Sequence, residues 1–295
     1  MSIHTSPSRR IFVLANTLLL IMLGFVFLAP VMHVAFASIS DPVKLNIKSG
    51  LIFWPLGKPT LEGYRIVLAS PNIAAGYMNT LFYVLAGTGI SMILTVTGAY
   101  CLSRKSFALR NPIMLFISFT MLFNGGLMPS YMVVRNLGLY NSRWAVIIPT
   151  AVSVFNLIIM RTSFLGIPAS LEEAAKIDGA NDVQTMFYVI LPVSKAVIAV
   201  IGLFYAVGLW NSWFPAMIYL RDRTKFPLQL ILREILLIND TSIMNSSADA
   251  TRNISVARQL VKYCTIMTAT VPILCVYPFI QKYFAKGVMI GSIKG

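Results

Sequence analysis

Long apolar segments separated by short polar ones are the dominant pattern of this sequence. A hydrocarbon core about 30 Å thick is crossed by roughly 20 helical residues. Apart from Lys282 near the end of the last one, the candidate segments contain no Asp, Glu, Lys or Arg. They lie at 11–37, 80–102, 113–134, 144–160, 196–219 and 264–283. The pattern predicts an all-α, polytopic membrane protein with about six transmembrane helices.

The composition agrees with a surface that faces lipid. Hydrophobic residues make up 57% of the chain and charged residues only 12%, whereas soluble domains carry about 25% charged residues. The first apolar segment is longer than the core of a signal peptide, so we expect it to remain as a helix. The basic residues behind the net charge of +14 lie between apolar segments, which favours lipid headgroups over nucleic acid as their partner.

The basic residues next to the first two segments predict the orientation of the chain. Arg9 and Arg10 precede the first segment, and Arg104, Lys105 and Arg110 follow the second. Cytoplasmic flanks of membrane helices are enriched in Lys and Arg, so both termini are expected in the cytoplasm. The count over all loops does not discriminate, because the long external loops are basic as well.

This orientation divides the chain into four parts. They are a cytoplasmic tail (1–10), a first transmembrane helix with an external segment (11–68), a core with five further helices (69–284) and a cytoplasmic tail (285–295). The core contains an internal loop at about 163–192 and an external loop at about 220–263. Basic residues of that external loop suggest a surface for an anionic substrate or an acidic partner protein; they include Arg221, Arg223 and Lys225.

The internal loop carries the signals of two short helices joined by a turn. Ser170 and Glu173 have the spacing of a capping box at a helix start, and Gly179 permits the left-handed conformation that ends a helix. Asn181 or Asp182 can cap the second helix. From these residues alone, a simple connecting hairpin and a docking element are equally good interpretations.

Two further features of the loop concern its surface and its end. Leu171, Ala174, Ala175 and Ala180 give it a face of mainly small side chains, which lets the backbone of a partner approach closely. Pro192 is expected to mark the start of the fifth span.

The spacing in this loop resembles that of a known family. Glu173-Ala174-Ala175 is followed by Gly179 and then by Leu191-Pro192, which is similar to the EAA loop of binding-protein-dependent ABC importer permeases. Val189 stands where that family usually has Ile.

Two other segments agree with this resemblance. The segment 59–64 is similar to the one that these permeases carry after their first helix, and the tail 284–295 is similar to the C-terminus of the carbohydrate, maltose-type branch. The stretch 272–295 looks closest to the subfamily for complex and acidic oligosaccharides, such as alginate and other uronides.

The resemblance implies a permease subunit of the bacterial inner membrane. Its partners would be a second homologous permease, two ATPase subunits and an external solute-binding protein. ATP and Mg²⁺ would bind to the ATPase subunits, and ATP hydrolysis would switch the helices between inward-open and outward-open states. The residues that would dock on the ATPases are Glu172, Glu173, Ala174, Ala175, Asp178, Gly179, Ala180, Asn181, Asp182, Lys294 and Gly295. For Glu173, docking and helix capping are equal alternatives.

Polar and aromatic residues within the spans are candidates for the substrate pathway. Asparagine amides can bond sugar hydroxyls, and indole rings can stack on sugar faces. The candidates are Asn124, Asn156, Trp210, Asn211 and Trp213. The alternative interpretation is an interfacial aromatic belt with hydrogen bonds between helices.

No catalytic, nucleotide-binding or metal-binding motif stands out. The Gly57-Lys58 pair is followed by Pro59 and lacks the earlier glycine of a P-loop, so the chain is not expected to hydrolyse ATP or to bind a cofactor or metal. The rival functions are an ATPase-independent secondary transporter or channel and an integral membrane enzyme. The first usually places ionisable groups inside its spans, and the second needs a cluster of titratable residues at one membrane face.

Overall fold

The computed structural model describes residues 7–48, 50–123, 125–241, 259–275 and 278. These residues form helices joined by turns and irregular segments, with no strand among them. The chain divides into two compact units, one made of 1–70 with 232–271 and the other of 71–231 with 272–295. The predicted all-α fold class is therefore confirmed.

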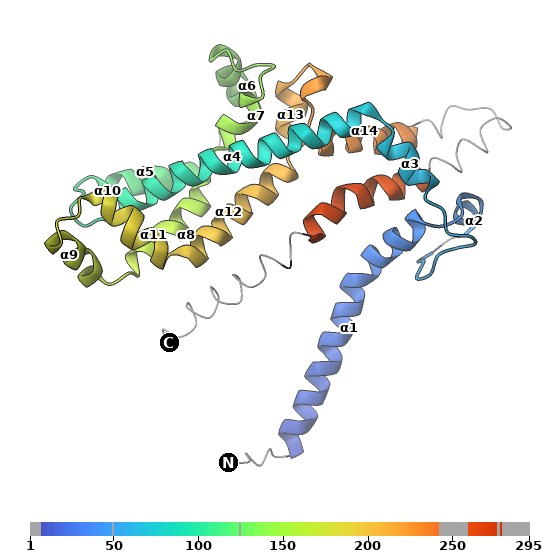
Figure 1. Ribbon diagram of the computed structural model, residues 1–295, viewed down its shortest axis with the longest axis horizontal. Helices are drawn as coiled ribbons and strands as arrows, with labels where there is room; N and C mark the ends of the chain where they lie inside the picture. Colours follow the sequence, from blue (N-terminus) through green and yellow to red (C-terminus); the bar gives the residue numbers. More distant parts are fainter. Residues whose placement is uncertain (1–6, 49, 124, 242–258, 276–277, 279–295) are drawn as a thin grey trace. The chain divides into compact units, whose positions relative to one another are not determined.

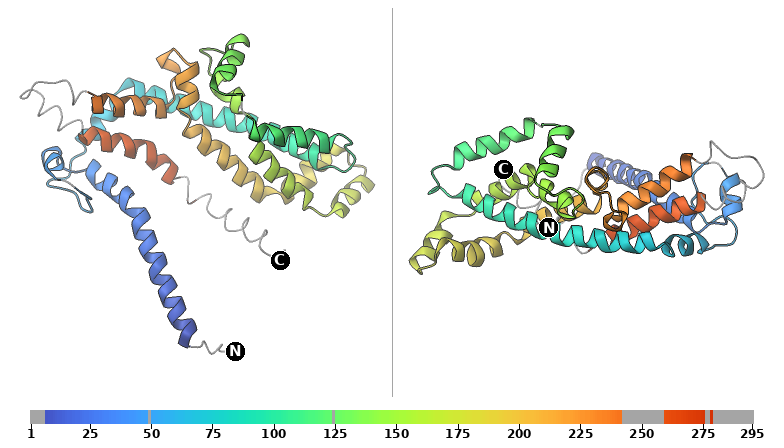
Figure 2. Two further views of the ribbon diagram at one scale, coloured as in Figure 1. Left: turned by 180° about the vertical axis from the view of Figure 1, so that it is seen from behind. Right: turned by 90° about the horizontal axis from the view of Figure 1, so that it is seen from above.

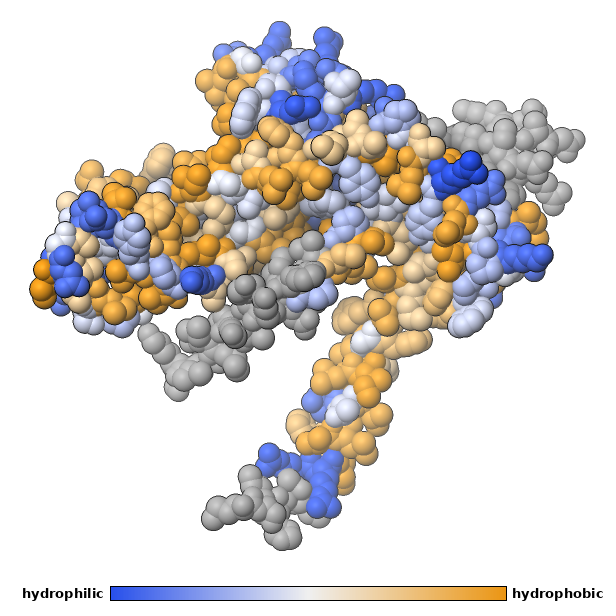
Figure 3. Space-filling model, viewed as in Figure 1, coloured by the Kyte–Doolittle hydropathy of each residue, from blue (hydrophilic) through white to orange (hydrophobic). Residues whose placement is uncertain are grey.

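The first unit is dominated by one long helix, α1 (Pro7–Ser38) (Figure 1). Its other described helices are α2 (Pro42–Ile47), α3 (Glu62–Leu68), the later turns of α14 (Leu228–Thr241) and much of the helix Gln259–Cys275. Apolar side chains cover α1 along most of its length, as Figure 3 shows, and Ile11 and Phe27 are 69% and 74% exposed. Because such a surface is unfavourable in water, α1 is suited to lipid.

Polar contacts fix the C-terminal end of α1 inside the first unit. The Ser38 and Tyr64 hydroxyls share a hydrogen bond of 2.7 Å, and the Cys264 thiol donates to the Ser38 carbonyl at 3.2 Å. Gly63 allows this close approach, since a Cβ atom there would lie 2.6 Å from the Cys264 sulfur. The end of α1 is thus held against α3 and the helix Gln259–Cys275.

The second unit is built around three helices that lie side by side in Figures 1 and 2. They are α4 (Pro71–Ser103), α8 (Val154–Leu165) and α12 (Lys195–Trp210). The remaining helices of this unit are α5 (Arg110–Leu122), α6 (Leu127–Asn136), α7 (Trp144–Ile147), η1 (Ile148–Thr150), α9 (Ala169–Ile177), α10 (Asp182–Thr185), η2 (Met186–Ile190), α11 (Leu191–Val193), α13 (Phe214–Tyr219), η3 (Arg223–Lys225) and the first turn of α14.

The core of this unit is apolar and lies between these three helices. Ala99 of α4, Met160 of α8 and Ile201 of α12 have no exposed surface, and Ile190 of η2 joins them. Close packing of this kind is what holds helices together inside a membrane, where the hydrophobic effect between them is weak. The internal loop therefore reaches into the same core through η2.

The structure divides several predicted spans at breaks. Two described helices, α1 and α4, are long and apolar enough to cross a membrane, and bent helix pairs raise the number to up to five. The predicted span 113–134 is two helices, α5 and α6, with Gly126 between them at φ +86. The predicted span 264–283 continues beyond the described residues. The count of about six spans therefore stays a prediction.

The other two breaks lie in the predicted spans 144–160 and 196–219. The predicted span 144–160 bends by 50° before α8, where Ser153 takes an extended conformation (ψ 121) and accepts from the Asn156 N–H as an N-cap. In the predicted span 196–219, α12 ends at Trp210 and a new helix, α13, begins at Phe214. Apolar composition predicts a span but does not show where its helix is interrupted.

A buried amide attaches the segment around η3 to α4. The Asn79 amide donates to the carbonyls of Thr224 (2.7 Å) and Phe226 (3.1 Å), and its oxygen accepts from Arg143 at 3.0 Å. The Thr80 hydroxyl accepts from the N–H of Leu228 at 2.8 Å. These bonds satisfy backbone groups that have no helical partner.

The charges of this segment are partly compensated by their neighbours. The Lys225 ammonium donates to the Asn141 carbonyl at 2.8 Å and lies 3.6 Å from the Asp222 carboxylate. Hydrogen bonds from the Thr224 hydroxyl and N–H, with a smaller effect of Lys225, hold the pKa of Asp222 below its usual value. Lys225 is therefore engaged within the chain, which weakens the hypothesis that it belongs to an anion-binding surface.

The substitution Asn79→Ala should loosen the η3 segment. It leaves the buried Phe226 carbonyl without its partner, and such a group costs about 1–3 kcal/mol. We expect the unfolding temperature of the purified protein to fall by roughly 5 °C and proteolysis near η3 to become faster. Thr97→Ala is the matched control, because this exposed α4 hydroxyl bonds only carbonyls of its own helix. An equal loss in both variants would contradict the proposed attachment.

Candidate functional site

The internal loop folds as two short helices, as predicted, but its first helix starts differently. The N-cap of α9 is Pro168 (φ −56, ψ 132), with no side-chain hydrogen bond at the cap. Ser170 therefore lies inside the first turn, two positions after the cap. The predicted capping box between Ser170 and Glu173 is wrong, because Pro168 has an extended ψ of 132 and the helical residues already begin at Ala169.

Gly179 ends α9 as the sequence predicts. Its φ is +83, its N–H donates to the Lys176 carbonyl, and the N–H of Ala180 donates to the Ala175 carbonyl at 2.9 Å. These two bonds form a Schellman motif, which satisfies carbonyls at the helix end. The turn between the two helices is thus fixed by backbone hydrogen bonds.

The second helix begins with a complete capping box. The Asn181 side chain accepts from the N–H of Gln184 at 2.8 Å, and the Gln184 side chain accepts from the N–H of Asn181 at 2.9 Å. Of the two cap candidates, Asn181 rather than Asp182 fills the role. The end of α9 and the start of α10 are thus both fixed by hydrogen bonds, and the two helices with their turn (169–185) form a stiff hairpin, which we call the EAA hairpin.

The helix after this cap contains a π-helical turn before it bends. α10 continues into η2, which is a π-helix, and then into α11. Pro192 cannot donate the bond that an α-helix would direct to the Tyr188 carbonyl, and a wider turn relieves this conflict. The chain bends by 87° at Ser194, and α12 begins at Lys195, one residue before the predicted span 196–219 and shortly after Pro192, which is expected to mark its entry.

The hairpin is attached to the end of α4 by two contacts, an ion pair and a hydrogen bond. Arg104 forms an ion pair with Glu172 and lies over the Tyr100 ring at 4.7 Å. The Tyr100 hydroxyl donates to the Asp182 carbonyl at 3.0 Å. Burial lowers the pKa of the Arg104 guanidinium from its usual value, with Tyr100 and Asp182 opposing the change, and arginine nevertheless stays charged at neutral pH. We call Tyr100, Arg104, Glu172 and Asp182 the α4 clamp.

A further contact holds α8 to the same end of α4. The Arg161 side chain donates to the Leu102 carbonyl at 2.9 Å. This carbonyl lies in the last turn of α4, where no helical N–H follows to bond it. The ends of α4 and α8 and the hairpin therefore form one connected structure.

The predicted docking residues divide into outward-facing and inward-facing sets. Glu173 and Ala174 are exposed on α9, and Asp178 is exposed directly after it. Ile177, which is not among the predicted docking residues, is 86% exposed beside them. Ala175 is only 8% exposed, so a partner would meet Ala174 and not Ala175. The predicted docking residues Lys294 and Gly295 lie outside the described residues.

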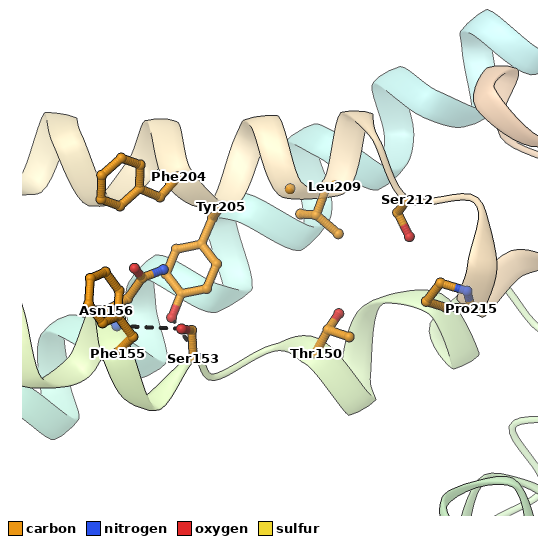
Figure 4. Close-up of a pocket in the computed structure, with 10 residues that line it drawn as sticks. Thr150, Ser153, Phe155, Asn156, Phe204, Tyr205, Leu209, Ser212 and Pro215 are labelled. Atoms are coloured by element: carbon orange, nitrogen blue, oxygen red, sulfur yellow. Dashed lines mark hydrogen bonds between the residues drawn. The ribbon is translucent and has the colours of Figure 1, made fainter. Parts of the chain in front are cut away.

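A cavity of about 640 Å³ lies between two of the broken helices of this unit (Figure 4). On one side are η1 and the start of α8, and on the other are α12 and the start of α13. Its lining contains no charged side chain. The lining residues are Thr150, Ser153, Phe155, Asn156, Phe204, Tyr205, Gly208, Leu209, Ser212 and Pro215.

The predicted pathway residues are only partly brought together. Asn156 lines the cavity, whereas the buried Trp210 packs near Tyr77 with ring centroids 6.4 Å apart. Asn211 donates to the carbonyl of Val207 in its own helix. Neither Trp210, Asn211 nor Trp213 is among the lining residues, and Asn124 lies outside the described residues. Sequence reasoning missed Ser153 and Tyr205, because a hydroxyl in an apolar segment gives no signal of its own.

Comparison with known proteins identifies the family. Residues 87–290 match the family described as the inner membrane component of binding-protein-dependent transport systems. The chain belongs to this family. The resemblance seen in the EAA loop is thereby confirmed.

Individual relatives of this family are similar over nearly their whole length. Protein LplC of Bacillus subtilis (strain 168) is 38% identical over 294 residues, covering 100% of this chain and 98% of that protein. The polygalacturonan/rhamnogalacturonan transport system permease protein YtcP of the same strain is 41% identical, covering 94% and 96%.

A solved structure shows the same fold. It is a chain of a bacterial ABC transporter involved in the import of the acidic polysaccharide alginate, with a TM-score of 0.84 and 35% identity, covering 95% of this chain and 99% of that one. The EAA loop of this family member is therefore set in a fold shared with a known transporter.

Breaking the α4 clamp should release the hairpin. Arg104→Ala removes a charge-assisted contact worth about 1.5–3 kcal/mol, so amide hydrogen exchange over 171–180 should become roughly tenfold faster in the purified protein. Glu172→Ala should speed exchange by the same factor. The double variant should exchange little faster than either single variant, because both substitutions remove the same ion pair.

Lys176→Ala serves as the control for this prediction. It breaks the ion pair with Asp182, whose atoms lie 3.9 Å apart on side chains that are 57% and 77% exposed. Exposed pairs contribute little, so exchange should change less than about twofold. Additive effects of Arg104→Ala and Glu172→Ala would contradict the clamp.

Proposed function

We propose that this chain is a permease subunit of an ATP-driven carbohydrate importer. Its substrates are oligosaccharides, including acidic ones. The single observation that carries the proposal is the EAA hairpin, which exposes α9 and is clamped to α4. Relatives named for polygalacturonan/rhamnogalacturonan and alginate transport support the substrate class.

The hairpin has the properties of a mechanical connection. Its exposed side, with Glu173, Ala174 and Ile177, offers a small and partly apolar surface to an ATPase subunit. Its inner side joins α4 through Arg104 and Tyr100, and η2 packs in the core with α8 and α12. A movement of α9 would therefore reach three membrane helices, which a flexible loop could not achieve.

The rest of the assembly follows from the family. A second homologous permease would complete the transmembrane pathway, two ATPase subunits would bind α9 and its counterpart, and an external binding protein would deliver the solute. ATP and Mg²⁺ would bind to the ATPase subunits and not to this chain. Both termini would lie in the cytoplasm, with Lys294 and Gly295 reaching between the ATPases.

A cysteine cross-link tests the proposed docking. In a background with Cys101 and Cys275 changed to serine, Ala174→Cys should cross-link to a co-purifying ATPase subunit, because Ala174 is exposed on α9. The complex should be purified from the native membrane in mild detergent and its products identified by mass spectrometry. Formation of the cross-link should change when ATP is added.

The control places the cysteine in the predicted external segment. Lys58→Cys should give no cross-link to an ATPase under the same conditions. Absence of any ATPase from the purified complex, together with transport in vesicles that lack ATP, would contradict the proposal and favour a secondary transporter or channel.

A further inference from the structure

The cavity between α8 and α12 has the features of a ligand site. We propose that it binds the hydroxyl-bearing, uncharged face of a sugar ring, with the Asn156 carboxamide as the group that bonds the hydroxyls. The inference rests on the proposed function and adds where this subunit contacts its substrate and through which chemistry. The carboxylate of an acidic sugar would be bound elsewhere.

Asn156 is the residue that points to a ligand. It is 5% exposed, it lines the cavity, and its backbone N–H donates to the Ser153 hydroxyl at 3.4 Å. Among the residues that the structure describes, its carboxamide has no partner. Its polar atoms are not among the fully buried atoms that lack a partner, so they are open to the cavity, where a ligand can accept from the NH₂ and donate to the oxygen.

The neighbouring hydroxyls hold the cavity wall in place. The Tyr205 hydroxyl accepts from the N–H of Ser153 at 3.0 Å and shares a hydrogen bond of 2.7 Å with Thr95. These bonds connect α12, α8 and α4 behind the cavity, and Figure 4 shows Tyr205 directed from α12 towards Ser153. The Tyr205 hydroxyl is therefore already bonded within the chain, whereas the Asn156 carboxamide is available to bond a ligand.

The composition of the lining favours an uncharged ring. No Lys or Arg is among the lining residues, and a carboxylate placed in an apolar site without a cation costs several kcal/mol. Phe155 and Phe204 provide flat apolar surfaces that suit the C–H face of a pyranose ring. The cavity of about 640 Å³ also lies within the usual range for small-molecule sites.

Gly208 offers a way to fill the cavity without disturbing the fold. It lines the cavity on α12, and an added Cβ would meet nothing within 4 Å. Gly208→Leu should therefore occupy the site while α12 gains helix propensity. Gly89→Leu is the matched control, since this α4 glycine also has open space around an added Cβ and does not line the cavity.

The experiment measures uptake by the complete transporter in liposomes with its binding protein. The probes are a uronic-acid oligosaccharide and its methyl ester. We expect Gly208→Leu and Asn156→Leu to reduce uptake of both probes by about tenfold or more, because the hydroxyl face is common to both. Gly89→Leu, which alters a residue that does not line the cavity, should leave uptake within about twofold.

ATP hydrolysis in the absence of substrate separates site loss from misfolding. It should be unchanged in Gly208→Leu and Asn156→Leu. Wild-type uptake by Gly208→Leu would overturn the inference, as would an Asn156→Leu effect confined to the free acid, which would show that the carboxylate is bound at this site. Failure of the wild-type complex to import either probe would instead contradict the proposed function.

Discussion

The attachment of the EAA hairpin to α4 is the interaction on which the arrangement of the second unit depends. Arg104 reaches from the end of α4 to Glu172 of α9, and Tyr100 one turn earlier bonds the backbone at Asp182. These contacts join elements that are far apart in the sequence. They connect the hairpin directly to a membrane helix, so that a force on α9 would be passed to α4 and not absorbed by the loop.

Interrupted helices are the second constraint on this unit. In an apolar environment, every backbone N–H and carbonyl that leaves a helix must find another partner. The breaks found here meet that requirement with hydroxyl and amide side chains, as Ser153 does for α8 and Asn79 does for the η3 segment. The break before α8 lies beside the cavity, where irregular backbone can also meet a polar ligand.

The two halves of the proposed function are thus linked through one helix bundle. The hairpin acts on the ends of α4 and α8, while the cavity lies between α8 and α12. Tyr205 and Thr95 connect α12 to α4 beside the cavity. A displacement of α9 and a change in the shape of the cavity are therefore expected to accompany one another.

The sequence by itself determined the all-α membrane class, the family, the Gly179 turn and the helix caps near Asn181, because these depend on hydropathy and on short-range backbone geometry. It did not determine where the spans break, that Pro168 replaces Ser170 as the cap, or which pathway candidates line a cavity. Those features depend on which distant side chains come together. Asn156 and Asn211 look alike in the sequence, and only the packing of α8 against α12 places one beside the cavity and leaves the other bonded to its own helix.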